Sequence, residues 1–207
     1  VFIHLVALHH VGSNNPDGVD IKKLKDENGV PLDGIAFHPY YTVHDLVGIV
    51  VFLFIFSLVI FFFPDGGGYF LEKPNFDPAN PLKTPEHIAP VWYYTPFYAI
   101  LRAVPSKLGG VIAMGAAIAI LFVLPWLDKS PVKSMRYKGW MSKVWLAIFV
   151  VSFVGLGYLG AVPADPIKTV LSQIFTVLYF LFFLLMPIYT AIETCKMPPK
   201  RVTGGKH

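Results

Sequence analysis

Charge is what this sequence lacks most. Only 14% of its 207 residues are charged, whereas a soluble domain carries about 25%. The deficit is concentrated in four runs that contain no charged residue, at 46–63, 108–127, 144–164 and 169–192. A helix needs roughly 20 apolar residues to cross a bilayer, and a segment in lipid must pair its own backbone polar groups. We therefore predict an all-α, polytopic membrane protein with transmembrane helices at about 46–63, 108–127, 144–161 and 169–192.

Cysteine is also nearly absent. The single Cys195 excludes an internal disulfide and a cysteine metal cluster. The sequence also has no internal repeat, nucleophile motif or phosphate-binding glycine loop. The apolar run at 1–11 lacks the basic leader and the small-residue cleavage site of a signal peptide. We interpret residues 1–12 as the end of a fifth helix, and the sequence as part of a longer membrane protein.

The basic residues are unevenly placed. Twelve of the 17 lysines and arginines lie in the connector at 13–45, the connector at 128–143 and the tail after residue 192. Alternation of the spans puts these three segments on one side, which the positive-inside rule makes the cytoplasmic or matrix side. This asymmetry explains the basic pI, so no nucleic-acid partner is predicted.

The connector that faces the other side is long and aromatic. Residues 85–102 contain three prolines, four tyrosine or tryptophan rings, the carboxylate of Glu86 and the imidazole of His87. Ordinary connectors are short and polar, whereas this one resembles aromatic surface at a membrane interface. An aromatic belt that only anchors helix ends is the simpler alternative.

Three polar side chains stand at the basic side. His4 lies in an apolar run, where it needs a partner: a polar neighbour, a water molecule, or a metal such as haem iron. His9 lies close to the polar boundary and can exchange protons with a bound substrate. Asp45 begins the first long span, where the helix dipole alone favours an acid. Alternatively, His9 and Asp45 bracket a small polar head group.

Ordered motifs then give a specific resemblance. In chain order they are His4–His9, Gly12–Pro16, Phe37–Thr42 with Asp45, Pro78–Leu82, Thr84–Pro85, His87–Ile88, Pro90–Tyr93, Phe97–Arg102 and Lys107–Gly110. Together they resemble the C-terminal half of proteobacterial cytochrome b of ubiquinol–cytochrome c reductases. The resemblance covers the whole chain, with a haem-ligating helix end at 1–12, a connector at 13–45 and the C-terminal domain with its four spans at 46–207.

The resemblance implies roles for individual residues. His4 matches an axial ligand of the high-potential b haem, and Asn14 lies in the haem pocket. The quinone-reduction pocket on the inner side is matched by His9, Ser13 and Asp45. The quinol-oxidation pocket on the outer side is matched by Pro90, Val91, Trp92, Tyr93 and Tyr98. Lys107 matches a region near the docking surface of the Rieske iron–sulfur protein.

The family's activity is a Q-cycle coupled to proton translocation. Quinol is oxidised at the outer pocket, and quinone is reduced at the inner one. The implied cofactors are two b haems in the full subunit, with ubiquinol and ubiquinone as substrates. The implied partners are the N-terminal half of cytochrome b, the Rieske protein, a c-type cytochrome and lipid, in a dimeric complex. The implied location is the bacterial inner membrane, with the mitochondrial inner membrane as the alternative.

Two positions depart from the family pattern. Val91 stands where the family signature has glutamate, and valine cannot accept a proton. We therefore expect Glu86 to take over part of this proton-accepting role, while Tyr93 and Tyr98 hold the quinol ring. The alternatives are that Glu86 is a solvated loop acid and that His87 or a water chain accepts the proton. His44 stands where many relatives have lysine, which makes the charge near the inner pocket depend on pH.

Three other classes of protein compete with this interpretation. Subunit IV of a photosynthetic b6f-type complex resembles the chain over three spans, but lacks the fourth span and the haem-ligating helix end. A transporter is expected to show interrupted helices and charges near mid-membrane. A structural anchor does not need His4, His9 and Asp45 toward one membrane face.

Overall fold

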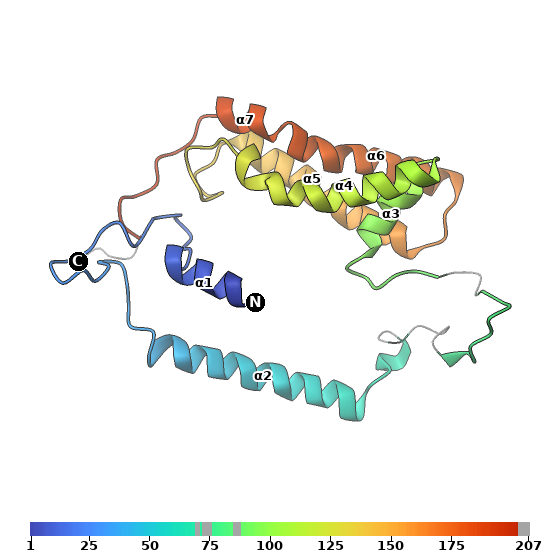
Figure 1. Cartoon of the computed structure of the whole chain (residues 1–207), viewed down its shortest axis with the longest axis horizontal. Helices are drawn as coiled ribbons and strands as arrows, with labels where there is room; N and C mark the ends of the chain where they lie inside the picture. The colour runs from blue at the N-terminus through green and yellow to red at the C-terminus, as the bar shows by residue number, and fades with distance from the viewer. Residues whose placement is uncertain (69–70, 72–75, 85–87, 203–207) are drawn as a thin grey trace. The chain divides into compact units, whose positions relative to one another are not determined.

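The computed structural model describes residues 1–68, 71, 76–84 and 88–202, and it divides into two units (Figure 1). The first unit combines Val1–Leu24 with the chain from His87 onward, and the second is Lys25–Glu86.

The α-helices of the described residues are α1 (Phe2–Val11), α2 (Tyr40–Phe62), α3 (Thr95–Ala103), α4 (Lys107–Leu127), α5 (Trp140–Ala161), α6 (Pro166–Leu184) and α7 (Met186–Ile192). A 3-10 turn, η1, spans Gly66–Gly68. These residues include no β-strand, and α2, α4, α5 and α6 are long and apolar enough to cross a membrane. The predicted all-helical, multi-pass fold is confirmed.

The core of the first unit lies where α5 and α6 pack together. α4 packs against α6, and the short helix α3 packs against α4, α5 and α6. The ring of Phe149 on α5 lies 4.6 Å from that of Phe182 and 5.4 Å from that of Tyr179, both on α6. Aromatic pairs at such separations add stability beyond the apolar area that they bury. The core is therefore an aromatic seam along two membrane-spanning helices.

The run predicted as one helix at 169–192 is two helices in the structure. α6 ends at Leu184 and α7 begins at Met186, with Leu185 between them. Pro187 is the physical reason, because proline lacks the N–H of an α-helical hydrogen bond and its ring crowds the carbonyl one turn earlier. Hydrogen bonds from the Leu185 N–H to Leu181 O and from the Tyr189 N–H to Leu185 O, each 3.0 Å, hold the two helices together.

A buried carboxylate caps α5. Glu193, which follows α7, accepts hydrogen bonds from the N–H of Ser142, at 3.0 Å, and from its hydroxyl. Ser142 lies in the first turn of α5, where backbone N–H groups have no partner within the helix. The negative charge also complements the positive end of the helix dipole. Glu193 thus joins the end of α7 to the start of α5.

In the second unit, α2 begins at Tyr40, whereas the charge-free run begins at Leu46. Asp45 is therefore inside α2 rather than in its first turn. The absence of charge marks the part of a helix that suits lipid, and polar residues can extend the helix beyond that part. None of the residues of α2 is buried within the structure.

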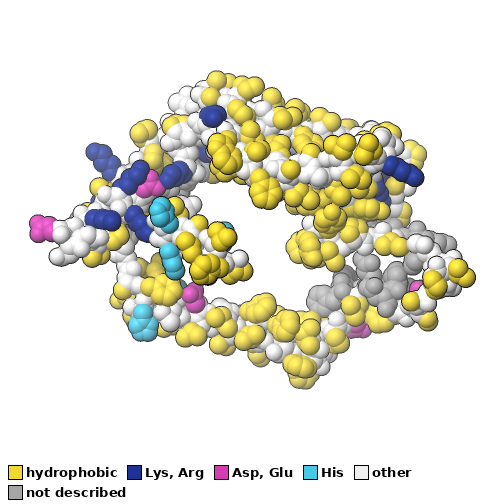
Figure 2. Space-filling view, viewed as in Figure 1, with side chains coloured by type: hydrophobic (Ala, Val, Ile, Leu, Met, Phe, Trp, Pro, Cys, Tyr) yellow, Lys and Arg dark blue, Asp and Glu magenta, His cyan; other side chains and the backbone are white. Residues whose placement is uncertain are grey.

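Three basic segments share one end of the first unit. The hydroxyl of Ser134 donates to the carbonyl of Pro16, and the N–H of Lys196 donates to the carbonyl of Tyr137. These contacts join the loop after α1, the α4–α5 connector and the tail. In the first unit, the Lys and Arg side chains gather mainly at this end (dark blue, Figure 2). The loop after α1, the α4–α5 connector and the start of the tail therefore meet at one end of the first unit, and the sidedness of the whole chain stays a prediction.

Candidate functional site

The C-terminal end of α1 is fixed by a lysine from the following loop. The ammonium of Lys22 donates to the carbonyl oxygens of His9 and His10. Carbonyls in the last turn of a helix have no partner within it, and a cation there suits the helix dipole. Gly12 ends the helix with a φ of 88°, which disfavours any residue with a side chain. The position of His9 is thus set by its own loop.

His4 lies one and a half turns before His9, among exposed apolar side chains. Phe2 and Ile3 beside it are more than three-quarters exposed. Within the described residues, no group of three or more His, Cys, Asp or Glu side chains could hold a metal ion. A single imidazole on an apolar helix nevertheless suits a haem, because the macrocycle supplies four nitrogen ligands of the iron and a protein side chain has only to supply one more. The donor and its surroundings therefore fit a haem.

Ser13 and Asn14 line an open pocket of about 340 Å³ in the first unit. Residues 11–14 and 18–21 supply most of the pocket wall, and Lys133 of the α4–α5 connector completes it. Lys133 also pairs with Asp20, and the hydrogen bonds from Lys133 and Lys23 lower the pKa of Asp20 to about 2. A carboxyl with a lowered pKa loses its stabilising contact only as the pH falls from about 4 to about 2. The ion pair is therefore intact at neutral pH.

The structure brings Ser13 and Asn14 together with His9 in the first unit, whereas Asp45 lies on α2 in the second. The side chain of Asp45 is exposed. A shared pocket for His9, Ser13 and Asp45 remains a prediction, as does the assignment of Asn14 to a haem pocket.

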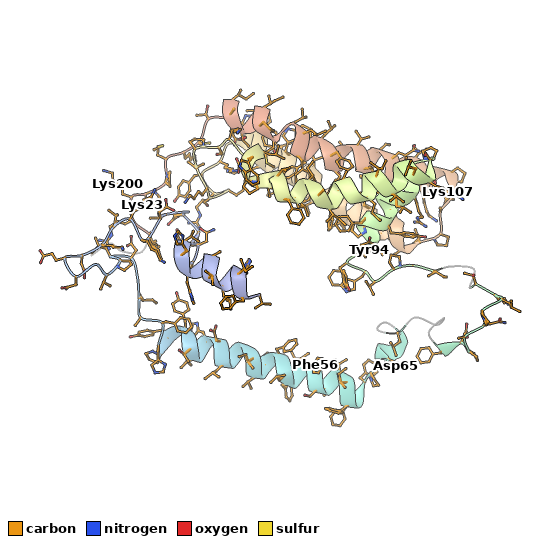
Figure 3. All side chains as sticks on the ribbon, in the orientation of Figure 1. Lys23, Phe56, Asp65, Tyr94, Lys107 and Lys200 are labelled. Carbon is orange, nitrogen blue, oxygen red and sulfur yellow. The ribbon has the colours of Figure 1, made fainter. Side chains whose placement is uncertain are left out.

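The aromatic segment forms a tight turn at the start of α3. The N–H of Tyr94 donates to Val91 O at 2.8 Å, and the hydroxyl of Thr95 donates to Trp92 O at 2.7 Å. The rings of Trp92 and Tyr93 meet edge to face with their centroids 5.6 Å apart. Trp92 is 83% exposed, and Val91 and Tyr93 are also exposed. Tyr94 and Lys107 lie at the same end of the bundle (Figure 3).

Tyr98, on α3, is held by Arg102. The guanidinium of Arg102 lies 4.7 Å from the centre of the Tyr98 ring, within the range of a cation–π contact. The same group donates to the carbonyls of Leu159 and Val162 at the C-terminal end of α5. Arg102 thereby fixes the tyrosine ring to the end of a membrane-spanning helix.

Two glycines let α3 approach its neighbours. A methyl group at Gly160 of α5 would overlap the carbonyl oxygen of Thr95 and lie 2.7 Å from its carbon. A methyl group at Gly110 of α4 would overlap the carbonyl oxygen of Leu101. The buried face of α3 consists of Thr95, Pro96, Ala99, Ile100 and Ala103. Small residues on both sides therefore set the position of the helix that carries Tyr98.

Sequence reasoning missed several of these residues. Arg102 appeared only within a family motif, and Gly160 only within the span predicted at 144–161. Glycine within a lipid-spanning run is the signal for close backbone approach, although it does not identify the partner. Glu86 and His87, predicted as proton acceptors, lie outside the described residues.

The chain is similar to cytochrome b from several organisms. Residues 78–180 match the family model described as cytochrome b (C-terminal)/b6/petD. Cytochrome b of Allochromatium vinosum is 64% identical over 99% of this chain and 51% of the relative. Cytochrome b of Rhodospirillum rubrum is 50% identical over 99% of this chain and 48% of the relative.

A solved structure, the hyperthermophilic respiratory Complex III, matches with a TM-score of 0.79 and 38% identity, covering 93% of this chain and 47% of the other. The chain spans about half the length of the curated cytochromes b described above. The family model, the relatives and the solved structure all point to the same family as the order of motifs in the sequence. The chain therefore belongs to the cytochrome b family and corresponds to its C-terminal region.

Proposed function

We propose that the chain serves quinol oxidation and quinone reduction in a respiratory ubiquinol–cytochrome c reductase. One observation carries the proposal: in the first unit, the pocket that Ser13 lines and the helix that carries Tyr98 contact opposite ends of the bundle. The loop after α1 contacts Arg136 of the α4–α5 connector, just before α5 begins, and Arg102 of α3 contacts Leu159 near the end of α5. A helix of 22 residues is about 33 Å long, close to the thickness of a bilayer core. The two ends of α5 are thus separated by about the thickness of a bilayer core, which supports one site at each membrane face.

The inner site is formed by His9, Ser13 and Asp45. His9 and Asp45 form hydrogen bonds with opposite ends of a quinone ring. They also deliver the protons that reduction of the quinone requires. Family membership and the placement of Ser13 on a pocket wall support this role. Basic residues at the same end favour the cytoplasmic side of a bacterial inner membrane.

The outer site is formed by Pro90, Val91, Trp92, Tyr93 and Tyr98. Tyr93 and Tyr98 hold the quinol ring, but a protonated phenol is a poor base. Valine at position 91 cannot accept a proton either, so the carboxylate of Glu86 takes part of that role. Lys107 is exposed at the start of α4, and the family resemblance puts it near the surface on which the Rieske protein would dock.

His4 would hold a haem iron through its imidazole. A bound haem supplies one-electron transfer between the two membrane faces. The imidazole would donate its lone pair to the iron from among the apolar side chains of α1. The N-terminal half of cytochrome b and a c-type cytochrome complete a dimeric complex.

Exchange of Asp45 for asparagine tests the inner site. We expect quinone-dependent reoxidation of the high-potential haem in the complex to slow at least tenfold, because a placed proton donor is commonly worth about a hundredfold or more. Quinol oxidation at the outer site should keep its rate. Stopped-flow spectroscopy of b-haem reduction and reoxidation measures both steps.

Asp65→Asn is the matched control, because Asp65 lies just beyond the other end of α2 (Figure 3). This variant should reoxidise the haem at the wild-type rate. If Asp45→Asn instead loses quinol oxidation and reoxidises the haem normally, the inner site has been assigned to the wrong end of the protein.

A further inference from the structure

A buried carboxylate joins the loop after α1 to the α4–α5 connector. Asp17 is 2% exposed, and its Oδ1 accepts hydrogen bonds from Arg136 Nη1 at 2.9 Å and from the Tyr137 hydroxyl at 2.6 Å. We call these three side chains the Asp17 clasp. None of them belongs to the quinone or haem sites described above.

Neighbouring contacts hold the loop in the same place. The hydroxyl of Ser134 donates to Pro16 O at 2.5 Å, and Lys133 pairs with Asp20. Gly18 has a φ of 70°, and a methyl group there would lie 3.0 Å from the backbone nitrogen of Ser134. The two segments are therefore in close backbone contact around the clasp.

The loop is also shaped from within. The side-chain oxygen of Asn15 accepts from the N–H groups of Asp17, at 3.2 Å, and Val19, at 3.0 Å, while its amide donates to Val19 O at 2.7 Å. This turn presents the Asp17 carboxylate to the connector. Asn15 directly follows Ser13 and Asn14, so Asp17 and these pocket-lining residues lie on one short segment of the chain.

The buried charge of Asp17 requires a partner of opposite charge and hydrogen-bond donors. A buried carboxylate is costly unless it is paired and hydrogen-bonded. Arg136 supplies the opposite charge, and Tyr137 supplies a second donor. The hydrogen bond to the Asp17 carboxylate also raises the pKa of Tyr137, so its hydroxyl stays protonated and continues to donate. The loop therefore lies where the donors of Arg136 and Tyr137 both reach the Asp17 carboxylate.

The clasp also determines the shape of the pocket beside Ser13. The pocket wall comes from both joined segments, with residues 11–14 and 18–21 on one side and Lys133 on the other. Movement of the loop away from the connector would open this wall and displace Ser13 and Asn14. His9 would move with them, because Lys22 of the same loop binds its carbonyl.

We propose that Asp17 is a positioning residue for the inner quinone site, acting through Arg136 and Tyr137. It does not contact the quinone. It fixes Ser13 and the end of α1 against the α4–α5 connector, so that the groups that bind the quinone ring keep their geometry. This inference rests on the proposed function of the inner site.

The test uses Asp17→Asn, Arg136→Met and the double variant in the assembled complex. We expect each single change to raise the KM for quinone in haem reoxidation about tenfold, because a misplacement of about 1 Å can cost as much as about a hundredfold. The double variant should resemble the single ones, since either change opens the same clasp. Hydrogen–deuterium exchange of residues 12–20 should rise in all three.

Tyr137→Phe is a milder variant that keeps the proposal testable if the other variants fail to assemble. It removes one hydrogen-bond donor and leaves the ion pair between Asp17 and Arg136 intact. It should raise the KM for quinone by a smaller factor and leave quinol oxidation unchanged. Asp165→Asn is the matched control: Asp165 pairs with Lys168 and caps α6 at the other end of the bundle. The KM for quinone should not change in this variant.

A His9→Phe variant distinguishes a failure of the proposed inner site from a failure of the positioning role of Asp17. Wild-type quinone reduction in His9→Phe would mean that the proposed inner site itself is wrong. Impaired reduction in His9→Phe together with a wild-type KM in both Asp17→Asn and Tyr137→Phe would overturn the positioning role alone. Loss of assembly in Asp17→Asn with a wild-type KM in Tyr137→Phe would also overturn it, since the clasp would then serve folding only.

Discussion

Replacing His4 with leucine should abolish the high-potential b-haem signal and leave the low-potential signal detectable. The imidazole is the side chain of α1 that can donate a lone pair to iron from the apolar part of the helix, and leucine has none. A haem that loses an axial ligand loses its characteristic spectrum or dissociates. Reduced-minus-oxidised difference spectra of the purified complex, with pyridine haemochrome quantification, measure the loss.

His10→Leu is the control for this change. His10 lies on the same helix, near its polar end, and the family resemblance gives it no ligand role. That variant should retain both haem signals at full occupancy. If His4→Leu also retains both, His4 does not bind haem iron and the assignment of α1 fails.

Gly160→Ala should displace α3 and impair the outer site. The added methyl group would overlap the carbonyl oxygen of Thr95, which is backbone and cannot rotate away. Overpacking of this kind costs about 1–3 kcal/mol, and it outweighs the gain of about 1 kcal/mol that alanine brings to a helix interior. We expect a lower midpoint of thermal unfolding and quinol-dependent haem reduction slowed about tenfold or more, as for other misplaced reacting groups.

Gly157→Ala separates packing from helix propensity. It lies one turn earlier on α5, where a methyl group would sit 3.7 Å from Pro96 and 3.8 Å from the Thr95 hydroxyl, in ordinary contact. This variant should be as stable as the wild type or slightly more so, with unchanged quinol oxidation. If Gly160→Ala behaves in the same way, α3 does not depend on close approach at that glycine.

The membrane-spanning helices could be predicted because their signal is local. A run without charge identifies a segment that suits lipid, and α2, α4, α5 and α6 all contain such a run. Helix ends are set by other forces: α2 extends into polar sequence, and Pro187 separates α6 from α7. The nine-residue α3 was not predicted, since a short helix whose buried face is made by its neighbours leaves no long apolar run.

The candidate sites were predictable where motifs mark them and hidden where contacts are distant in sequence. His4, His9, Trp92 and Tyr98 stand in motifs that can be found along the chain. Asp17 meets Arg136 and Tyr137 about 120 residues away, and no local pattern pairs them. Long-range hydrogen bonds of buried charges depend on the fold, so they become visible only when the helices are packed.

The most direct test of the central claim is a redox titration of the visible spectrum of the purified complex that contains this chain. Membership of the cytochrome b family, with haem and quinone sites in working order, predicts two b-type components of different midpoint potential. The higher-potential component should become oxidised when quinone is added to the reduced complex. A complex without b-type absorption, or with a high-potential component that quinone cannot oxidise, would contradict the account.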